Sequence, residues 1–156
     1  MAPTLNSSAV LGRLASLPLE IYQQGELVLK GGSTTGKLLI MTEGAVEVVR
    51  GGVRIDEIGE PGAVFGELAI LLDQPHSADV RALRPSTFYV ADGRTILRVD
   101  PVVALYVAVV LAQRLDSVNR HLVEARARLE RTDQPHRVLR QTLDDIGRTL
   151  QHGPPL

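Results

Sequence analysis

The strongest constraint on the fold is a sharp change in the chain at Asp100-Pro101. From residue 102 to residue 131 the sequence contains no glycine and no proline, and alanine, leucine, arginine, valine and glutamate dominate. This stretch predicts one long helix, because both residues that most disfavour a helix interior are absent. Asp100 suits the N-cap and Pro101 suits the first helical position. We therefore expect a long helix over residues 101–132.

The part before this helix is typical of short strands separated by glycine-rich turns. In several segments apolar and polar residues alternate, as with Val46 and Val48 around Glu47. The pair Gly51-Gly52 between two such runs indicates a hairpin. The expected strands are 19–22, 27–30, 37–42, 45–50, 53–58, 77–83 and 87–91. Their spacing favours a sandwich, barrel or jelly roll over residues 19–100, after an N-terminal helix or lead-in at 1–18.

Composition narrows the classes of function. The net charge is −1, so the whole chain exerts no long-range attraction on nucleic acid or an anionic membrane. The absence of cysteine excludes disulfides, thiolate metal sites and cysteine nucleophiles. No signal peptide is visible, and the longest apolar run, residues 102–112, is shorter than the ~20 residues that span a bilayer. We expect a soluble cytoplasmic protein without a membrane span.

The second part of the long helix carries a regular apolar seam. Its members alternate steps of four and three residues, as in a coiled-coil core: Leu111, Leu115, Val118, Leu122, Ala125 and Leu129. One explanation is packing within the chain against a second amphipathic helix in residues 133–156, after a break at Asp133-Gln134-Pro135. The other is a homodimer through Leu111, Leu115, Val118, Leu122 and Leu129, because the second helix is too short to cover the first.

The segment FGELAILLDQPHSADVRAL, residues 65–83, carries the most specific chemistry. A glycine-containing loop that enters a short helix directs backbone N–H groups to one place, which suits phosphate. A carboxylate at Glu67 suits the hydroxyl groups of a ribose, and His76 and Ser77 would supply a cation and a hydroxyl. Together these are the parts of a sugar-phosphate site. The spacing alone fits equally well a hairpin loop in which Glu67 caps a helix.

Residues 21–115 resemble the cyclic nucleotide-binding domain, the regulatory module of catabolite-activator-type regulators, cyclic-nucleotide-dependent kinases and gated channels. The matching pieces occur in order, and they are Ile21-Tyr22, Gly25-Glu26, residues 36–40, residues 43–46, Pro61-Gly62, residues 65–69 and residues 75–78. The resemblance implies a mainly β fold with α-helices. It would be a β jelly roll (a double-stranded β-helix) followed by a long C-terminal helix and one further helix.

The resemblance also implies a ligand, a 3′,5′-cyclic nucleotide held by a phosphate-binding cassette. cAMP is favoured over cGMP only as the commoner ligand, and no cofactor is expected. The implied ligand-binding residues are Phe65, Gly66, Glu67, Leu68, Ala69, His76, Ser77, Ala78 and Asn119. The long helix would close over the base, and its rearrangement would carry the signal to an effector protein.

Each residue has an implied role by its match to the family. Gly66 and Glu67 match positions that meet the ribose 2′-hydroxyl. The pair Leu68-Ala69 matches backbone contacts to phosphate. The pair Ser77-Ala78 matches a phosphate contact next to a small residue that allows close approach. Asn119 is the candidate for hydrogen bonds to the purine edge, and the alternative is a polar residue flanking the apolar seam.

His76 departs from the family pattern, which has arginine at this position. Arginine pairs two phosphate oxygens with a permanently charged fork, whereas histidine is charged only part of the time. Three explanations remain open. The site binds a cyclic nucleotide more tightly at acid pH through protonated His76, it has lost the nucleotide and the domain is a dimeric scaffold, or it takes another small ligand.

Enzymatic and DNA-binding functions are less consistent with the sequence. The four histidines, His76, His121, His136 and His152, are scattered without metal-ligand spacing, and no nucleophile-elbow or phosphate-loop motif of an enzyme is present. We expect no catalytic residues and no metal site. Residues 133–156 leave room for one helix, too little for a helix-turn-helix, and have no basic stripe. We therefore expect no direct DNA binding.

Overall fold

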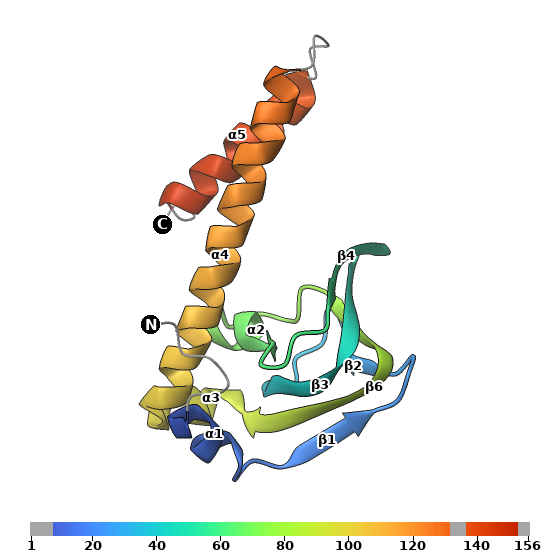
Figure 1. Ribbon diagram of the computed structural model, residues 1–156, viewed down its shortest axis with the longest axis vertical. Coiled ribbons are helices and arrows are strands. Elements are labelled where there is room, and N and C mark those ends of the chain that lie inside the picture. The colour runs from blue at the N-terminus through green and yellow to red at the C-terminus, as the bar shows by residue number, and fades with distance from the viewer. Residues whose placement is uncertain (1–7, 132–136, 153–156) are drawn as a thin grey trace. The chain divides into compact units, whose positions relative to one another are not determined.

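The computed structural model describes residues 8–131 and 137–152. Its elements are α1 (Ser8–Leu14), β1 (Leu19–Tyr22), β2 (Leu27–Leu29), β3 (Lys37–Arg50), β4 (Val53–Ile58), β5 (Val64–Phe65), α2 (Glu67–Leu71), β6 (Asp79–Asp92), α3 (Gly93–Val99), α4 (Pro101–Glu130) and α5 (Arg137–His152). The predicted order of a β domain, a long helix and one further helix is confirmed (Figure 1). The predicted break at Asp133-Gln134-Pro135 and the end of the C-terminal tail lie outside the described residues.

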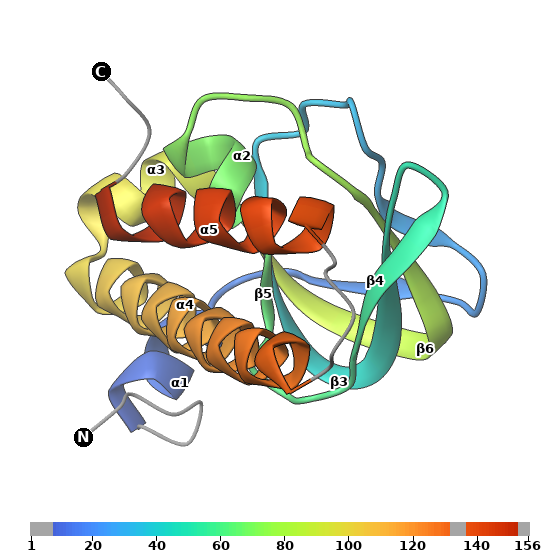
Figure 2. The same cartoon turned by 90° about the horizontal axis from the view of Figure 1, so that it is seen from above.

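All six strands belong to one antiparallel sheet. The main strand order is β1-β6-β3-β4, while β2 also pairs with β6 and β5 also pairs with β3. The sheet curls so that its strands surround a common interior (Figure 2). That interior is filled by a cluster of buried side chains from β2, β3, β5 and β6, namely Val28, Leu29, Leu39, Met41, Val46, Phe65, Val80, Ala82, Phe88 and Val90.

Two predicted pairs of strands are single long strands, which corrects the prediction. The predicted strands 37–42 and 45–50 are both part of β3, and 77–83 and 87–91 both fall largely within β6. Gly44 lets β3 continue, because its φ is 116° and a Cβ there would lie 2.4 Å from the Cβ of Ser86. Ser86 fills this place and bonds through its hydroxyl to the N–H and carbonyl of Ala45, each at 3.1 Å. The pairing of β3 with β6 shifts register here, so Pro85 is accommodated within β6.

Three helical segments pack together at one end of the sheet (Figure 1). They are α1, α3 and the beginning of α4. The helix α3 was not predicted, and it lies inside the stretch assigned to the β domain. The Asp100 carboxylate accepts hydrogen bonds from the N–H groups of Val102 and Val103 at 3.0 and 3.2 Å, so its predicted N-cap role is confirmed. The Tyr106 hydroxyl, which is buried, donates to the carbonyl of Gly62 at 2.7 Å and ties α4 to the β domain.

The chain divides into two compact units, Met1–Val110 and Leu111–Leu156. The division falls inside α4, whereas the predicted boundaries were at residues 100 and 132. The first unit holds the sheet, α1, α2, α3 and the start of α4. The second holds the rest of α4 together with α5.

In the second unit α5 lies beside the later part of α4 (Figures 1 and 2). Arg126 and Asp144 join the two helices by an ion pair of 2.9 Å. A cavity of about 200 Å³ between them is lined by Arg126, Leu129, Glu130, Arg140, Leu143 and Asp144. Packing within the chain, the first explanation of the apolar seam, is therefore present at its C-terminal end. Leu115 and Val118 at the other end remain 43% and 45% exposed.

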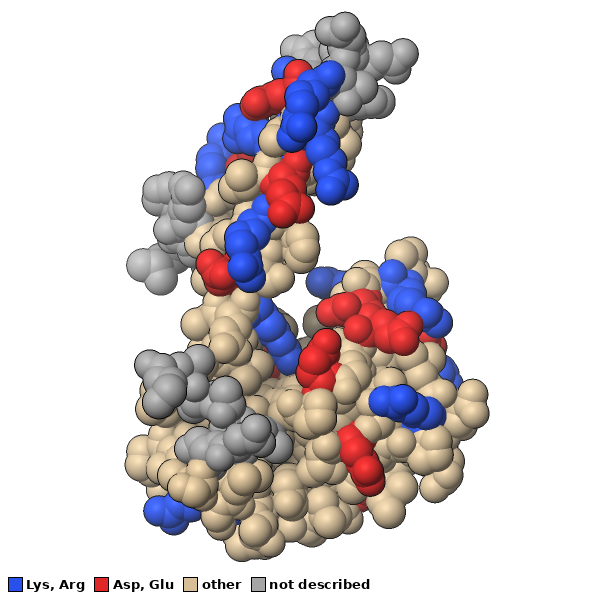
Figure 3. Space-filling model, in the orientation of Figure 1, with Lys and Arg blue, Asp and Glu red and all other residues tan. Residues whose placement is uncertain are grey.

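Arginine and acidic side chains are interspersed along the described surface of this second unit (Figure 3). Three further ion pairs, Arg120–Asp116, Arg126–Glu130 and Arg148–Asp145, lie within single helices. Neighbouring charges of opposite sign at this spacing support a helix.

Among the described residues, α4 is the one helix whose length and composition would allow it to cross a membrane. Its most apolar window of 18 residues has a mean hydropathy of 1.5. Length and composition alone are weak evidence, and packing against the first unit accounts for part of the apolar character at the start of α4. There Val103, Tyr106 and Val107 are buried in the first unit.

Candidate functional site

The candidate site begins where β5 turns into α2. Phe65 ends β5, and its buried ring meets Phe88 edge-on at 6.0 Å between centroids. Gly66 follows as the N-cap of α2 with a φ of 85°. A Cβ at this position would lie 2.3 Å from the carbonyl oxygen of Lys37, so only glycine lets α2 approach the start of β3 so closely. The side chain of Phe65 therefore serves the core, and only its backbone is available to a ligand.

His76 lies directly beside this turn. Its ring carbon Cε1 is 3.7 Å from the place that a Cβ on Gly66 would occupy. Its backbone pairs with the loop before β3, because its N–H donates to the carbonyl of Ser33 at 2.9 Å and its carbonyl accepts from the N–H of Gly32 at 2.8 Å. The fold thus brings residue 76 against the Gly66 turn and against a loop more than forty positions earlier.

The imidazole of His76 is only 6% exposed and is held by one neighbour. Its Nε2 lies 2.9 Å from the hydroxyl oxygen of Thr35. Burial lowers the pKa of His76 from its ordinary value of 6.5, because a charged ring is less well solvated there. In the absence of a ligand the ring is therefore neutral at physiological pH.

The remaining predicted residues of the cassette surround this centre with different exposures. The side chain of Glu67, the first residue of α2, is 3% exposed. Ala69 and Ala78 are half-buried, whereas Leu68 and Ser77 are exposed. The structure therefore brings Gly66 and His76 into proximity and sets the rest on the same turn, short helix and following segment. A carboxylate in the first turn of a helix is also favoured by the helix dipole.

Asn119 belongs to the other compact unit. It is exposed on α4 and lines a shallow hollow together with Arg120, Val123 and Glu124. Its predicted contact with the base stays a prediction.

Thr35 is a residue that the sequence analysis missed. It lies in the polar stretch Ser33-Thr34-Thr35 between Gly31-Gly32 and Gly36, which reads as an ordinary flexible turn. No spacing rule connects this turn with His76. Only the pairing of the loop with the segment before β6 brings the two side chains together.

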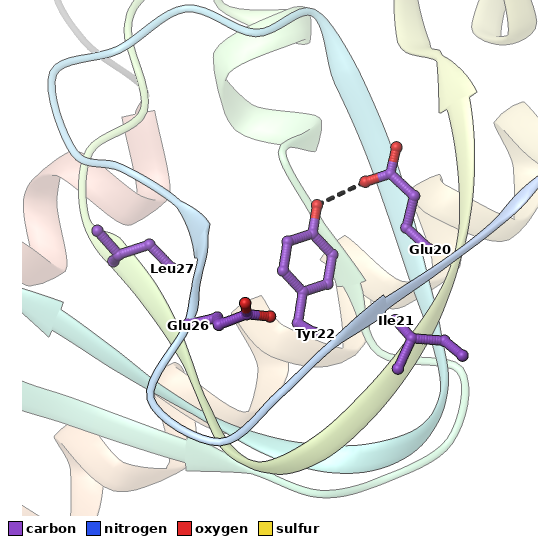
Figure 4. Close-up of a pocket in the computed structure, with 5 residues that line it drawn as sticks. All are labelled: Glu20, Ile21, Tyr22, Glu26 and Leu27. Carbon is purple, nitrogen blue, oxygen red and sulfur yellow. Dashed lines mark hydrogen bonds between the residues drawn. The ribbon is translucent and has the colours of Figure 1, made fainter.

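A separate pocket of about 470 Å³ lies in the first unit beside β1 and the start of β2. Figure 4 shows its lining, with the Tyr22 ring reaching toward Glu20 and with Glu26 opposite. The Tyr22 hydroxyl donates to Glu20 at 2.6 Å, and Lys37 bonds to the same carboxylate at 2.9 Å. These hydrogen bonds, Tyr22 first, lower the pKa of Glu20, while burial and the Glu20 contact raise the pKa of Tyr22 far above its usual range.

This pocket is unsuited to phosphate. Two of its five lining residues are acidic, and the carboxylate of Glu26 accepts a hydrogen bond from the N–H of Gln23 at 2.6 Å. None of the predicted ligand-binding residues lines it. Within the described residues no cluster of three or more histidine, cysteine or acidic side chains could hold a metal ion.

The chain matches the cyclic nucleotide-binding domain family over residues 19–99 and belongs to it. This match covers the whole β domain, including the cassette. The predicted family membership and the jelly-roll fold are therefore confirmed, and the class of protein is a cyclic nucleotide-binding regulatory domain.

Particular relatives fit this assignment. The chain is 32% identical over 95 residues to a cAMP-dependent protein kinase regulatory subunit of Yarrowia lipolytica, a match that covers 61% of this chain and 25% of that protein. Among solved structures, the catabolite activator protein of Thermus thermophilus has a TM-score of 0.62 and 26% identity, over 78% of this chain and 60% of that one. A cyclic nucleotide-binding domain from Methylobacillus flagellatus has the same TM-score at 22% identity, over 78% and 72% of the two chains. The chain thus spans about a quarter of the kinase subunit.

Proposed function

We propose that this chain is a cAMP sensor in which the ligand occupies the turn between β5 and α2. The family match over residues 19–99 carries this proposal. The geometry supports it, because Gly66 and His76 lie together at the position of the family's phosphate-binding cassette. The proposed ligand contacts are Phe65, Gly66, Glu67, Leu68, Ala69, His76, Ser77, Ala78 and Asn119. cAMP is preferred to cGMP only as the commoner ligand.

The weak point of the site is the phosphate clamp at His76. Loss of a charged hydrogen bond costs about 1.5–3 kcal/mol, which corresponds to a roughly ten- to hundredfold loss of affinity. This loss weakens binding without abolishing it, since the glycine turn and Glu67 are retained. A bound phosphodiester would oppose the effect of burial and favour the protonated ring, so affinity should rise toward acid pH.

The proposed output is a rearrangement of α4 that an effector protein reads. Ligand can drive it only by binding the two positions of α4 with different affinities. Hydrogen exchange of α4 with and without saturating cAMP tests this output, and unchanged protection would exclude it.

We further propose a cytoplasmic homodimer through Leu111, Leu115, Val118, Leu122 and Leu129, without catalysis and without direct DNA binding.

The second candidate is a dimeric scaffold that has lost the nucleotide. The predicted replacement of arginine by His76, together with the burial that lowers the pKa of its ring, favours this candidate. In this case the domain would act through α4 and α5 alone.

Calorimetric titration with cAMP and cGMP at pH 6 and pH 7.5 separates the two candidates. The native protein should bind, more tightly at pH 6, and His76→Arg should bind more tightly than the native protein at both pH values. If neither protein released heat, the sensor would be excluded. Binding by His76→Arg alone would show an intact pocket that His76 has inactivated.

A further inference from the structure

Thr35 connects His76 to the backbone at the start of β3. Its hydroxyl oxygen accepts a hydrogen bond from the N–H of Lys37 at 3.2 Å. The same oxygen lies 2.9 Å from Nε2 of His76. A hydroxyl has one proton to donate, and here the oxygen already serves as the acceptor for a backbone donor. The oxygen has a second lone pair, so in its contact with Nε2 it either donates its own proton or accepts one from the ring.

The direction of this hydrogen bond decides which nitrogen of His76 carries its proton. A neutral imidazole has one N–H and one acceptor nitrogen, and the hydrogen bond to one of them selects the tautomer. When Nε2 accepts from Thr35, the ring proton must be on Nδ1. We propose that Thr35 is a positioning residue of the ligand site, which holds neutral His76 in the Nδ1–H form so that the ring donates to a phosphate oxygen without being charged.

The Nδ1 atom of His76 is not fully buried. Every fully buried side-chain nitrogen and oxygen in the described parts of the chain has a hydrogen-bond partner. The ring of His76 makes its hydrogen bond through Nε2, so Nδ1 must retain some accessible surface. With Nε2 at the Thr35 hydroxyl, Nδ1 is the ring nitrogen left for a ligand, and it can donate to a phosphate oxygen from a neutral ring only in the Nδ1–H form.

The charged groups on the elements around His76 are already engaged or buried. The Lys37 ammonium is paired with Glu20 at 2.9 Å, and the Asp79 carboxylate accepts from the N–H of Gly31 at 2.7 Å. Glu67 on α2 is the remaining charged residue of the cassette, and it is buried. The lowered pKa of His76 has burial as its cause, so the neutral form is the one that Thr35 must orient.

The consequence is a site with two modes of binding. Near neutral pH the ligand receives an uncharged hydrogen bond from Nδ1–H, which depends on Thr35. At acid pH both nitrogens carry protons, so Nδ1–H is present whether or not Thr35 fixes the tautomer. This inference rests on the proposed function, because the acceptor is taken to be a phosphate oxygen of a cyclic nucleotide.

The test compares Thr35→Val with Thr35→Ser and Thr34→Val. Valine preserves the shape of threonine without the hydroxyl, and serine restores the hydroxyl. Thr34 is the adjacent exposed threonine and serves as the matched control. Nitrogen-15 NMR of the ligand-free proteins reports the tautomer of His76, and titration with cAMP and cGMP at pH 7.5 and 5.5 reports affinity. Thermal melts establish that each variant is folded.

We expect the Nδ1–H tautomer in the native protein, in Thr35→Ser and in Thr34→Val, and its loss in Thr35→Val. We expect Thr35→Val to bind about three- to tenfold more weakly at pH 7.5 and to lose less affinity at pH 5.5, because a protonated ring carries Nδ1–H with or without Thr35. A native Nε2–H tautomer would overturn the proposal. So would an equal loss at both pH values, which indicates a purely structural role. If the native protein binds neither nucleotide, the proposed function fails, while the NMR result still decides whether Thr35 sets the tautomer.

Discussion

The two units of this chain bury their apolar side chains very differently. In the unit up to Val110, Phe88, Leu39, Met41 and Val46 have no accessible surface. In the unit from Leu111 onward, none of the side chains with a described exposure is buried, although aliphatic residues line both helices. A hydrophobic core stabilises the first unit, whereas the two helices side by side leave apolar side chains such as Leu115 and Val118 exposed. The second unit therefore depends on something else to cover it, and we propose a second copy of the chain.

The largest expected effect is the loss of the core in the first unit. Phe88→Ala removes a ring that packs against both Tyr22 and Phe65 at 5.7 and 6.0 Å between centroids. The free energy of unfolding should fall by about 3–5 kcal/mol, measured by urea denaturation. Val123→Ala in the second unit changes a side chain that is 70% exposed. It should alter the free energy of unfolding by less than about 0.5 kcal/mol. Similar losses for the two variants would contradict this contrast.

The next effect concerns the backbone at the candidate site. Gly66→Ala combines a positive φ with a Cβ only 2.3 Å from the carbonyl of Lys37, whereas Gly25→Ala has a nearly equal φ of 86° and open space around it. We expect Gly25→Ala to cost about 1 kcal/mol from backbone strain and Gly66→Ala at least about 1–3 kcal/mol more from the close contact. Thermal melts measure both costs. Equal costs would show that the approach of α2 to β3 is not tight.

The following test asks whether a second copy covers the second unit. Leu122 lies on the apolar seam and is half-buried, while its neighbour Val123 lies off the seam and is exposed. Leu122→Asp should destabilise the unit by about 1–2 kcal/mol and dissociate the dimer, and Val123→Asp should leave the dimer intact. Sedimentation equilibrium measures the association state of the two variants. A native protein that is monomeric at every concentration would rule out the homodimer.

The smallest effect is the pH dependence that His76 gives to the first unit. Because burial lowers its pKa in the folded protein, the unfolded chain takes up a proton more readily. The stability from this group is therefore complete above the ordinary pKa of 6.5 and is lost as pH falls through the lower folded value. Urea denaturation of the ligand-free protein at pH 7.5 and 5.5 should show this decrease, and His76→Gln should reduce it. Saturating cAMP should act in the opposite direction, because a bound phosphate favours the charged ring.

Local patterns predicted most of the elements correctly. The long helix followed from the absence of glycine and proline after Pro101, and the strands β1, β2 and β4 followed from alternation and glycine turns. The same local rules failed at Glu43-Gly44 and at Pro85. There they indicate a turn, but the pairing of β3 with β6 and the hydroxyl of Ser86 keep both strands continuous. Because tertiary pairing supplies the missing hydrogen bonds, a local signal for a break does not end the strand.

The sequence by itself determined the class of protein and the order of its parts, since both depend on residue types and spacings along the chain. It also led to the prediction that His76 takes the place of an arginine in the cassette. Only the tertiary structure decided what surrounds that histidine. Thr35 is 41 residues away along the chain, and no periodicity relates the two. They meet because the loop before β3 pairs with the segment before β6, and this pairing buries the ring and presents its Nε2 to the hydroxyl.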